Sequence, residues 1–324
     1  MAVKIGKNFH IIHLTDDLKA LDAWYYDIFS CQRYMPDSYM KSEVRDASLV
    51  LIGDLCIEPL APAFHVEGWD NMPLGRFYNR LGTRFHSFAW HVDEGLDELY
   101  HDLREHGVRC YGTAGVKQED DSVRGALFTH PRDTYTQLEF VPAPRPDGPA
   151  VLRDPRYRPD WSPAWWADFH PLQVQKLSHS TVSVRDVDKA RDLYVDVFRG
   201  KLLHQGEVAH HQTESAFVLV GEDMVIEFAQ PLEPTSPVAV DMERYHESIY
   251  SVTYKVRDLA QAEEYLTRKG VSFLTNDGTT MVSDPATTMG CTMAFSTWSV
   301  PGDPRPDWSE HTEGPLPIDF LRQA

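Results

Sequence analysis

The sequence predicts an α+β protein in which four βαβββ units form two domains. Three observations support this: the length and composition of the chain, an internal repeat, and the same order of strand and helix patterns in each repeat. The chain has 324 residues, of which 42% are hydrophobic and 25% are charged. Since a domain usually spans about 100–200 residues, this length is typical of two globular domains.

An internal repeat organises the chain. Residues 10–29 and 179–198 match at a constant offset, the one that separates His10 from His179. The same offset holds without a gap through the pairs Asp17 and Asp186, Tyr25 and Tyr194, Phe29 and Phe198, Asp54 and Asp223, and Glu58 and Glu227. A register kept over this span indicates a duplicated unit.

A second pair of segments, residues 85–108 and 249–271, repeats less closely. Ser87 matches Ser251, and Gly107 matches Gly270 after a slip of one residue. All four segments begin with alternating apolar residues, which is typical of a strand, and continue with apolar residues three and four apart, which is typical of an amphipathic helix.

Local signals mark where these helices begin and end. Asp17 and Asp186 stand where a side chain can cap a helix N-terminus, and Gly107 and Gly270 suit a C-terminal stop. Further strands follow each helix and end in the runs LCIEPL, TQLEFV, MVIEFA and TMAFST. Each segment therefore predicts one βαβββ unit.

The breaks between these patterns predict the domain boundaries. We expect a first domain at residues 1–148 and a second at residues 177–299. The connection at 149–176 lacks a clean period and contains several tryptophans, so we expect it to pack on the body of the protein. Residues 300–324 are rich in proline and read as an irregular tail.

The chain resembles the vicinal oxygen chelate superfamily, which includes glyoxalase I, extradiol dioxygenases and bleomycin resistance proteins. The residues that carry the resemblance are a His that opens the first strand of a unit and a Glu on its last strand, and it covers roughly residues 8–143 and 177–297. The resemblance implies two glyoxalase-like domains with curved mixed sheets. It also implies one divalent metal ion, of which Fe, Mn, Zn, Ni and Co suit imidazole and carboxylate ligands.

The resemblance also implies which residues would hold that ion. The matching metal-ligand positions are occupied by His10, Glu58, Glu139, His179 and Glu227. Glu58 and Glu139 are in addition the candidates for catalytic proton transfer. The remaining ligand positions of the superfamily hold residues that are poor ligands, namely Ser87, Ser251, and Ala294 or Met293.

Two structural questions stay open at this level. If units pair in sequence, the first domain gathers His10, Glu58 and Glu139; if they pair across domains, Glu139 joins His179 and Glu227. His86 is a further candidate ligand, but a register shift that turned it inward would flip its whole strand to the other face. We therefore expect His86 to face away from the site.

The leading functional hypothesis is a metal-dependent lyase or isomerase that moves a proton on a small, aromatic, oxygen-chelating substrate. One alternative is an extradiol-type ring-cleaving dioxygenase, which needs a second His. The other is a non-enzymatic protein that binds a small molecule, since several ligand positions of the superfamily are lost. No phosphate-binding glycine loop or nucleophile elbow is present in the sequence.

Charge and cysteine content bear on partners and location. The formal net charge is −18, which argues against binding to nucleic acid or to an anionic membrane surface. The four cysteines form no C-x-x-C pair, and the first residues lack the pattern of a secretory signal. We expect a cytoplasmic protein with a small-molecule substrate, and a homo-oligomer is compatible with the resemblance.

Overall fold

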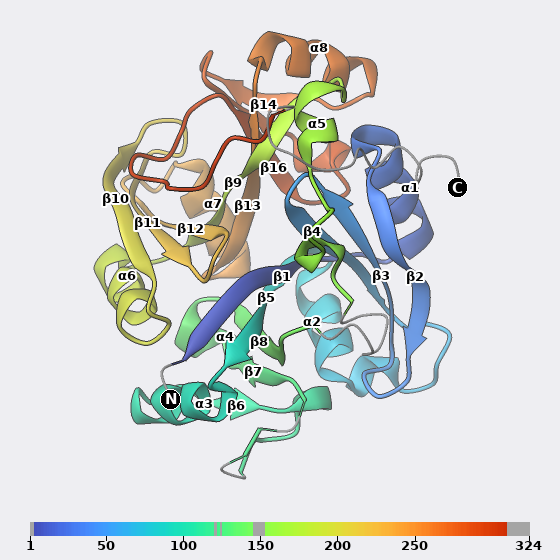
Figure 1. Ribbon diagram of the computed structural model, residues 1–324, viewed down its shortest axis with the longest axis vertical. Helices are drawn as coiled ribbons and strands as arrows, with labels where there is room; N and C mark the ends of the chain where they lie inside the picture. The colour runs from blue at the N-terminus through green and yellow to red at the C-terminus, as the bar shows by residue number, and fades with distance from the viewer. Residues whose placement is uncertain (1–2, 120–121, 124, 145–152, 310–324) are drawn as a thin grey trace.

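A computed structural model describes residues 3–119, 122–123, 125–144 and 153–309. It contains two sheets of eight strands each, one built from the first half of the chain and one from the second (Figure 1). The expected α+β architecture of two domains with mixed sheets is confirmed. Residues 149–152 of the expected connection and 310–324 of the expected tail lie outside the described residues.

The first half of the chain contains two βαβββ units. The elements are β1 Lys4–Leu14, α1 Leu18–Phe29, β2 Gln32–Met40, β3 Arg45–Ile52, β4 Leu55–Pro62, η1 Trp69–Asn71, α2 Pro73–Leu81, β5 Arg84–Glu94, α3 Leu96–Glu105, β6 Cys110–Tyr111, η2 Thr113–Gly115, β7 Leu127–Thr129, α4 Pro131–Thr134 and β8 Gln137–Pro142. Two short helices follow in the connection, η4 Pro155–Tyr157 and α5 Ala164–Asp168.

The second half repeats this order. Its elements are β9 Val174–Ser183, α6 Val187–Asp196, β10 Lys201–Val208, β11 Thr213–Val220, β12 Met224–Pro231, α7 Pro237–Tyr245, β13 Ser248–Val256, α8 Leu259–Arg268, β14 Phe273–Asn276, β15 Thr280–Ser283, η5 Pro285–Thr287 and β16 Thr292–Ser296. The cap predictions hold, since Asp17 and Asp186 accept backbone hydrogen bonds at the helix starts, and Gly107 and Gly270 have positive φ.

Strand order answers the question of unit pairing. The first sheet runs β2-β3-β4-β1-β5-β8-β7-β6, and the second runs β10-β11-β12-β9-β13-β16-β15-β14. In both sheets the first strands of two consecutive units pair antiparallel at the centre, β1 with β5 and β9 with β13. Units therefore pair in sequence within each domain.

One apolar core joins the two domains. Buried side chains from α1, α3, α6 and α8 and from one face of each sheet form a single hydrophobic cluster. Its aromatic contacts cross between the domains, with Phe29 against Tyr254 at 5.1 Å between ring centroids and Phe140 against Phe198 at 5.7 Å. We call the sheet faces that pack here the core faces.

Two helices that the sequence reasoning did not predict, α2 and α7, precede the second unit of each domain. Both begin with a proline at the first helical turn, which suits a helix start. Side chains of α2 pack on the opposite face of the first sheet, and Val238 of α7 does the same in the second. These helices cover the faces that lie away from the shared core.

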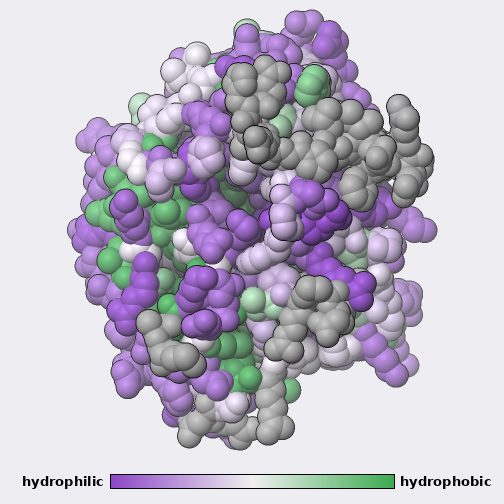
Figure 2. Space-filling view, viewed as in Figure 1, coloured by the Kyte–Doolittle hydropathy of each residue, from purple (hydrophilic) through white to green (hydrophobic). Residues whose placement is uncertain are grey.

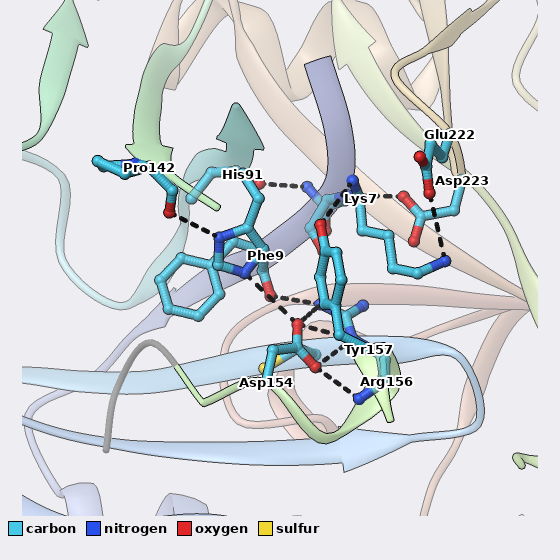
Figure 3. Close-up of polar contacts among 12 residues, drawn as sticks. Lys7, Phe9, His91, Pro142, Asp154, Arg156, Tyr157, Glu222 and Asp223 are labelled. Carbon is cyan, nitrogen blue, oxygen red and sulfur yellow. Dashed lines mark hydrogen bonds and ion pairs between the residues drawn. The ribbon is translucent and has the colours of Figure 1, made fainter. Parts of the chain in front are cut away.

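The segment that follows each domain contains the same three residue types, and we call these two segments the straps. The connection carries Asp154-Pro155-Arg156, and the tail carries the same three residue types at 303–305. The guanidinium of Arg156 pairs with Asp154 (Figure 3). It also donates hydrogen bonds to the carbonyl oxygens of Asn8, Phe9 and Asp54. Arg305 does the same in the second domain, with acceptors Leu177, Ser178 and Asp223. The expected irregular tail is therefore, as far as residue 308, a second copy of the strap.

Two equivalent hydrogen bonds connect the domains, each from a backbone N–H of one domain to a carboxylate of the other. Asp223 of the second domain, labelled in Figure 3, accepts a hydrogen bond at 2.6 Å. The donor is the backbone N–H of Asn8 in the first domain. Asp54 of the first domain accepts one from the backbone N–H of Leu177 at 2.7 Å. Asp54 and Asp223 are equivalent in the sequence repeat, so duplication supplied both halves of this contact.

Asp223→Asn is expected to remove most of a pH-dependent loss of stability. Burial raises the pKa of Asp223 from 3.8 to about 6, so the folded protein binds the proton more tightly than the unfolded chain does. Stability therefore falls as pH rises from about 4 to 6, by about 3 kcal/mol. Urea unfolding at pH 5 and pH 8 should show a smaller difference for the variant, because the amide oxygen still accepts from Asn8. Asp70→Asn, at an exposed site, is the control, and an equal pH difference in both variants would contradict the assignment.

The surface seen in Figure 2 is mostly hydrophilic, with hydrophobic residues gathered over the side where β10 and β11 lie. Charged side chains account for much of this character, as the composition predicts. No helix in the described part of the chain is both long enough and apolar enough to span a bilayer.

Candidate functional site

The candidate residues lie on the sheet faces opposite the core faces, which we call the site faces. On β4, Ile57 points into the shared core, so the alternation of a strand turns Glu58 to the other side, with Cys56 and Leu60. On β8 the same alternation separates Glu139 from Leu138 and Phe140 of the core. Strand parity thus places the predicted carboxylates on one face of the first sheet.

The central candidate of the first domain is His10. Its Nε2 atom lies 3.1 Å from Oε2 of Glu58 and 3.5 Å from Oε2 of Glu139. His10 and Glu58 are almost fully buried, and Glu139 is 9% exposed. The sequential pairing of units brings these three predicted residues together, since β1 lies between β4 and β5, and β8 lies beyond β5.

Arg45 is a site residue that the sequence reasoning missed. Its Nη1 atom lies 2.5 Å from Oε1 of Glu58, and its side chain also pairs with Glu43. Burial would raise the pKa of Glu58, but Arg45 and His10 outweigh burial and hold this pKa below its ordinary value. Glu58 therefore stays ionised, with Oε1 bound to Arg45 and Oε2 turned toward His10.

His86 lies on the site face, contrary to expectation. Ile11 pairs with Phe88 and His13 with Phe85, so two residues of β5, His86 and Ser87, oppose one residue of β1. Because of this β-bulge, the residues before and after it, Phe85 and Phe88, both point into the shared core. His86 turns the other way, toward α2, where its ring packs on Phe77 at 4.3 Å between centroids. His86 therefore reaches the site face through a local bulge and not through a register shift of the whole strand.

The protonation of His86 follows from its surroundings. Burial lowers its pKa to about 4, although the nearby carboxylate of Glu58 opposes the shift. The ring is therefore neutral near pH 7, which is the form that binds a metal or accepts a proton. Its Nδ1 atom lies 3.0 Å from the hydroxyl of Ser87.

The first-domain site fits a divalent cation by its donor atoms. Among the described residues, no three His, Cys, Asp or Glu side chains already enclose one point. Yet both ring nitrogens of His10 and Oε2 of Glu58 are buried without a hydrogen-bond partner in the described part of the chain. Two ligands bound to one metal at about 2.1 Å lie about 3.0–3.4 Å apart, close to the separations seen from His10 to both carboxylates. One imidazole and two carboxylates suit Mn, Fe, Zn, Ni or Co.

The second domain keeps part of the same arrangement. Nε2 of His179 lies 3.4 Å from Oε2 of Glu227, so this predicted pair also meets. In the first sheet, Ala89 of β5 pairs with His10 on one side and with Glu139 on the other. In the second sheet, Thr253 of β13 pairs in the same way with His179 and with Ala294. Ala294 therefore stands in the place of Glu139, and the fourth unit supplies no carboxylate there.

Several other histidines have structural surroundings. Nδ1 of His13 lies 2.8 Å from the hydroxyl of Tyr25, and its Nε2 lies 2.9 Å from the carbonyl oxygen of Met289. Figure 3 shows His91 beside Asp154 of the first strap. His211 is different, since its Nδ1 atom lies 3.6 Å from Oε2 of Glu227.

The missed residues differ in whether the sequence offered a signal. Arg45 alternates with Ala47, Leu49 and Leu51, which line the site face, so strand parity alone points to it. The bulge at His86 and the turn that carries His211 leave no comparable pattern, because both depend on how neighbouring strands pair.

Known proteins are similar to all or part of this chain. Residues 178–291 match the model of the glyoxalase/bleomycin resistance protein/dioxygenase superfamily. A variant of 4-hydroxymandelate synthase from Streptomyces coelicolor has a similar fold, with a TM-score of 0.62 and 12% identity over 99% of this chain and 100% of that chain. Methylmalonyl-CoA epimerase from Mycobacterium tuberculosis is 23% identical over 38% of this chain and 87% of that chain, with a TM-score of 0.36. No curated protein sequence matches significantly.

The matched segment spans the two units of the second domain up to the start of β16, and the first domain repeats their order of elements and strands. The full-length similarity to the synthase extends the shared fold to both domains. Residues 178–291 therefore match the glyoxalase/bleomycin resistance protein/dioxygenase superfamily, and the whole chain shares the two-domain fold of the synthase.

Proposed function

We propose that the protein is a metal-dependent enzyme that transfers a proton on a small, oxygen-chelating organic substrate, at the site face of the first domain. The observation that carries the proposal is the position of Nε2 of His10, which lies 3.1 and 3.5 Å from the carboxylates of Glu58 and Glu139. His10, Glu58 and Glu139 would hold the cation. The ion would supply Lewis acidity to two neighbouring substrate oxygens.

The two carboxylates have different roles. Glu58 is bound by Arg45 and kept ionised, so it is a fixed ligand and a weak base. Glu139 is the more exposed of the two and makes its ion-pair contact with His10. Glu139 is therefore the residue that takes a proton from the substrate and returns it.

The surroundings favour an aromatic or otherwise apolar substrate. Buried aliphatic residues of the site face meet Leu74, Phe77 and Tyr78 of α2 and Trp161 of the connection. The indole N–H of Trp161 is buried and has no hydrogen-bond acceptor among the described residues. A substrate oxygen would satisfy this donor while the rings contact an apolar body.

Metal analysis of the full chain tests the proposal. His10→Gln is expected to lower the affinity for Mn(II) or Zn(II) at the first-domain site at least 10-fold, because His10 contacts both carboxylates. The measurement is bound metal per chain after equilibrium dialysis. His65→Gln, an exposed histidine beside Asp46, is the matched control. Metal binding that is equal in wild type and His10→Gln would overturn the proposed site.

Activity is tested separately with a panel of small aromatic 2-oxo and 2-hydroxy acids. Metal-loaded protein in D₂O is expected to exchange a carbon-bound hydrogen of a substrate for deuterium, which proton NMR detects. Tight binding of a panel compound without exchange, and without metal, would instead identify a small-molecule binding protein.

The position of His86 favours a second candidate function, an extradiol-type ring-cleaving dioxygenase. That chemistry needs a second His near the metal, and the bulge in β5 turns a neutral His86 toward the side of Glu58. Oxygen uptake with a panel of catechols, after anaerobic loading with Fe(II), distinguishes the two functions. Uptake that is lost in His86→Gln would favour ring cleavage, and no uptake by fully loaded protein would reject it for those catechols.

A further inference from the structure

The site face of the second domain gathers two histidines around one carboxylate. Oε2 of Glu227 on β12 lies 3.4 Å from Nε2 of His179 on β9 and 3.6 Å from Nδ1 of His211. All three side chains are at most 3% exposed. His211 comes from the turn between β10 and β11, a position outside the ligand pattern that the repeat predicts.

No guanidinium pairs with the carboxylate of Glu227 in the described part of the chain, whereas Arg45 pairs with Glu58 in the first domain. Pro62 pairs with Arg45 in the first sheet, and the equivalent Pro231 pairs with Thr213 in the second. A threonine thus stands where the first domain has its guanidinium. Hydroxyl groups donate to the carboxylate instead, from Ser215 at 2.8 Å and from Thr181 at 2.5 Å.

Among the described residues, the carboxylate of Glu227 has only these two hydroxyl groups and the two imidazoles as side-chain partners, and no lysine or arginine pairs with it. A buried carboxylate with only hydroxyl and imidazole partners needs a positive charge beside it. Either a protonated imidazole or a bound cation can supply that charge.

Unsatisfied atoms favour the cation. Within the described part of the chain, five buried atoms on or beside this site face lack a hydrogen-bond partner: His179 Nε2, His211 Nδ1, His211 Nε2, Ser251 Oγ and Thr253 Oγ1. The other ring nitrogen of His179, Nδ1, lies 3.0 Å from the hydroxyl of Ser178, which fixes the ring with Nε2 toward Glu227. A metal-bound histidine is usually held by its second nitrogen in this way.

We propose that the second domain has a divalent-cation site of its own, with His179, His211 and Glu227 as ligands. Two imidazoles and one carboxylate favour a borderline transition metal such as Zn, Fe, Co or Ni, whereas the first-domain set is richer in carboxylates. The two sites therefore differ in donor set and in metal preference. The second site shares no ligand with the proposed catalytic site, so either can fail alone.

Titration of metal-free full-length protein with Co(II) tests this site. The ring of Trp298 lies 6.5 Å from the ring of His179 between centroids, so an open-shell ion at this site should quench Trp298 fluorescence. Wild type is expected to bind two equivalents, and His10→Gln to keep one strongly bound equivalent together with the quenching. In the His10→Gln background, His211→Gln should weaken the remaining binding at least 10-fold, and Trp298→Phe should lose the quenching but not the binding.

His204→Gln is the matched control, because His204 packs on Phe217 in the same domain. Unchanged Co(II) affinity in His211→Gln would overturn the role of His211. Wild type that binds one equivalent or less, with Trp298 fluorescence unaffected, would overturn the second site. This result does not depend on whether a variant folds. If His10→Gln alone loses all metal, the second site is wrong and the first stands.

Discussion

Glu139→Gln is expected to lower kcat by about 10²–10⁴-fold, because a glutamine keeps the shape of the side chain but cannot accept a proton. Glu139 is the more exposed carboxylate and contacts His10, whereas Glu58 is bound by Arg45. The measurement is the rate of hydrogen–deuterium exchange on the substrate that the panel identifies, with each variant saturated with metal.

Two comparisons make the result specific to a proton carrier. Glu94→Gln, at the exposed end of β5, should leave kcat unchanged. Glu139→Asp keeps a carboxylate and should recover part of the rate, with a pH profile that still depends on that group. A fall in metal content that fully accounts for the lost rate, or no fall in kcat at saturating metal, would show that Glu139 does not move the proton.

Arg156→Met is expected to destabilise the fold by about 3–5 kcal/mol, because it leaves Asp154 as an uncompensated buried charge. Arg156 also donates to the carbonyl oxygens of Asn8, Phe9 and Asp54, which lose these donors in the variant. The carbonyls of Asn8 and Phe9 belong to β1, which also carries His10, so the strap holds this strand in place. Urea unfolding followed by far-UV circular dichroism measures the change.

The chain offers matched controls for this variant. Arg305→Met removes the equivalent guanidinium of the second strap and should destabilise the protein less, because Lys176 still pairs with Asp303 at 3.0 Å. Arg158→Met, two residues after Arg156, breaks an exposed pair with Asp160 and should change stability little. A similar effect of Arg156→Met and Arg158→Met would show that the strap does not hold the domain.

The predicted fold and the predicted site residues depended on different information. Alternating and helical apolar patterns, together with the repeat from His10 and Glu58 to His179 and Glu227, were enough to predict four βαβββ units. The straps at 154–161 and 303–308 repeat as well, at a shorter offset than the strands and helices, and a comparison of the two segments would have found them. Helices α2 and α7 were missed because they are short and lie between the repeated segments.

The candidate site was predictable only where a residue lies on a regular strand. Alternation along β4 and β8 fixes the face of Glu58 and Glu139 once the strands are assigned. His86 was assigned to the wrong face because a bulge changes the parity of its strand, and nothing in the sequence marks where the extra residue falls. His211 lies in the turn between β10 and β11, where no strand alternation indicates the direction of a side chain.

The sequence by itself determined which residues are repeated and which elements they form, because hydrophobic period and helix caps act within a few residues of the chain. Only the tertiary structure decided that units pair in sequence, that Arg45 neutralises Glu58, and that His211 reaches Glu227. These contacts join residues through strand pairing, the bulge and the burial of charge, and such effects arise only when the sheets have formed.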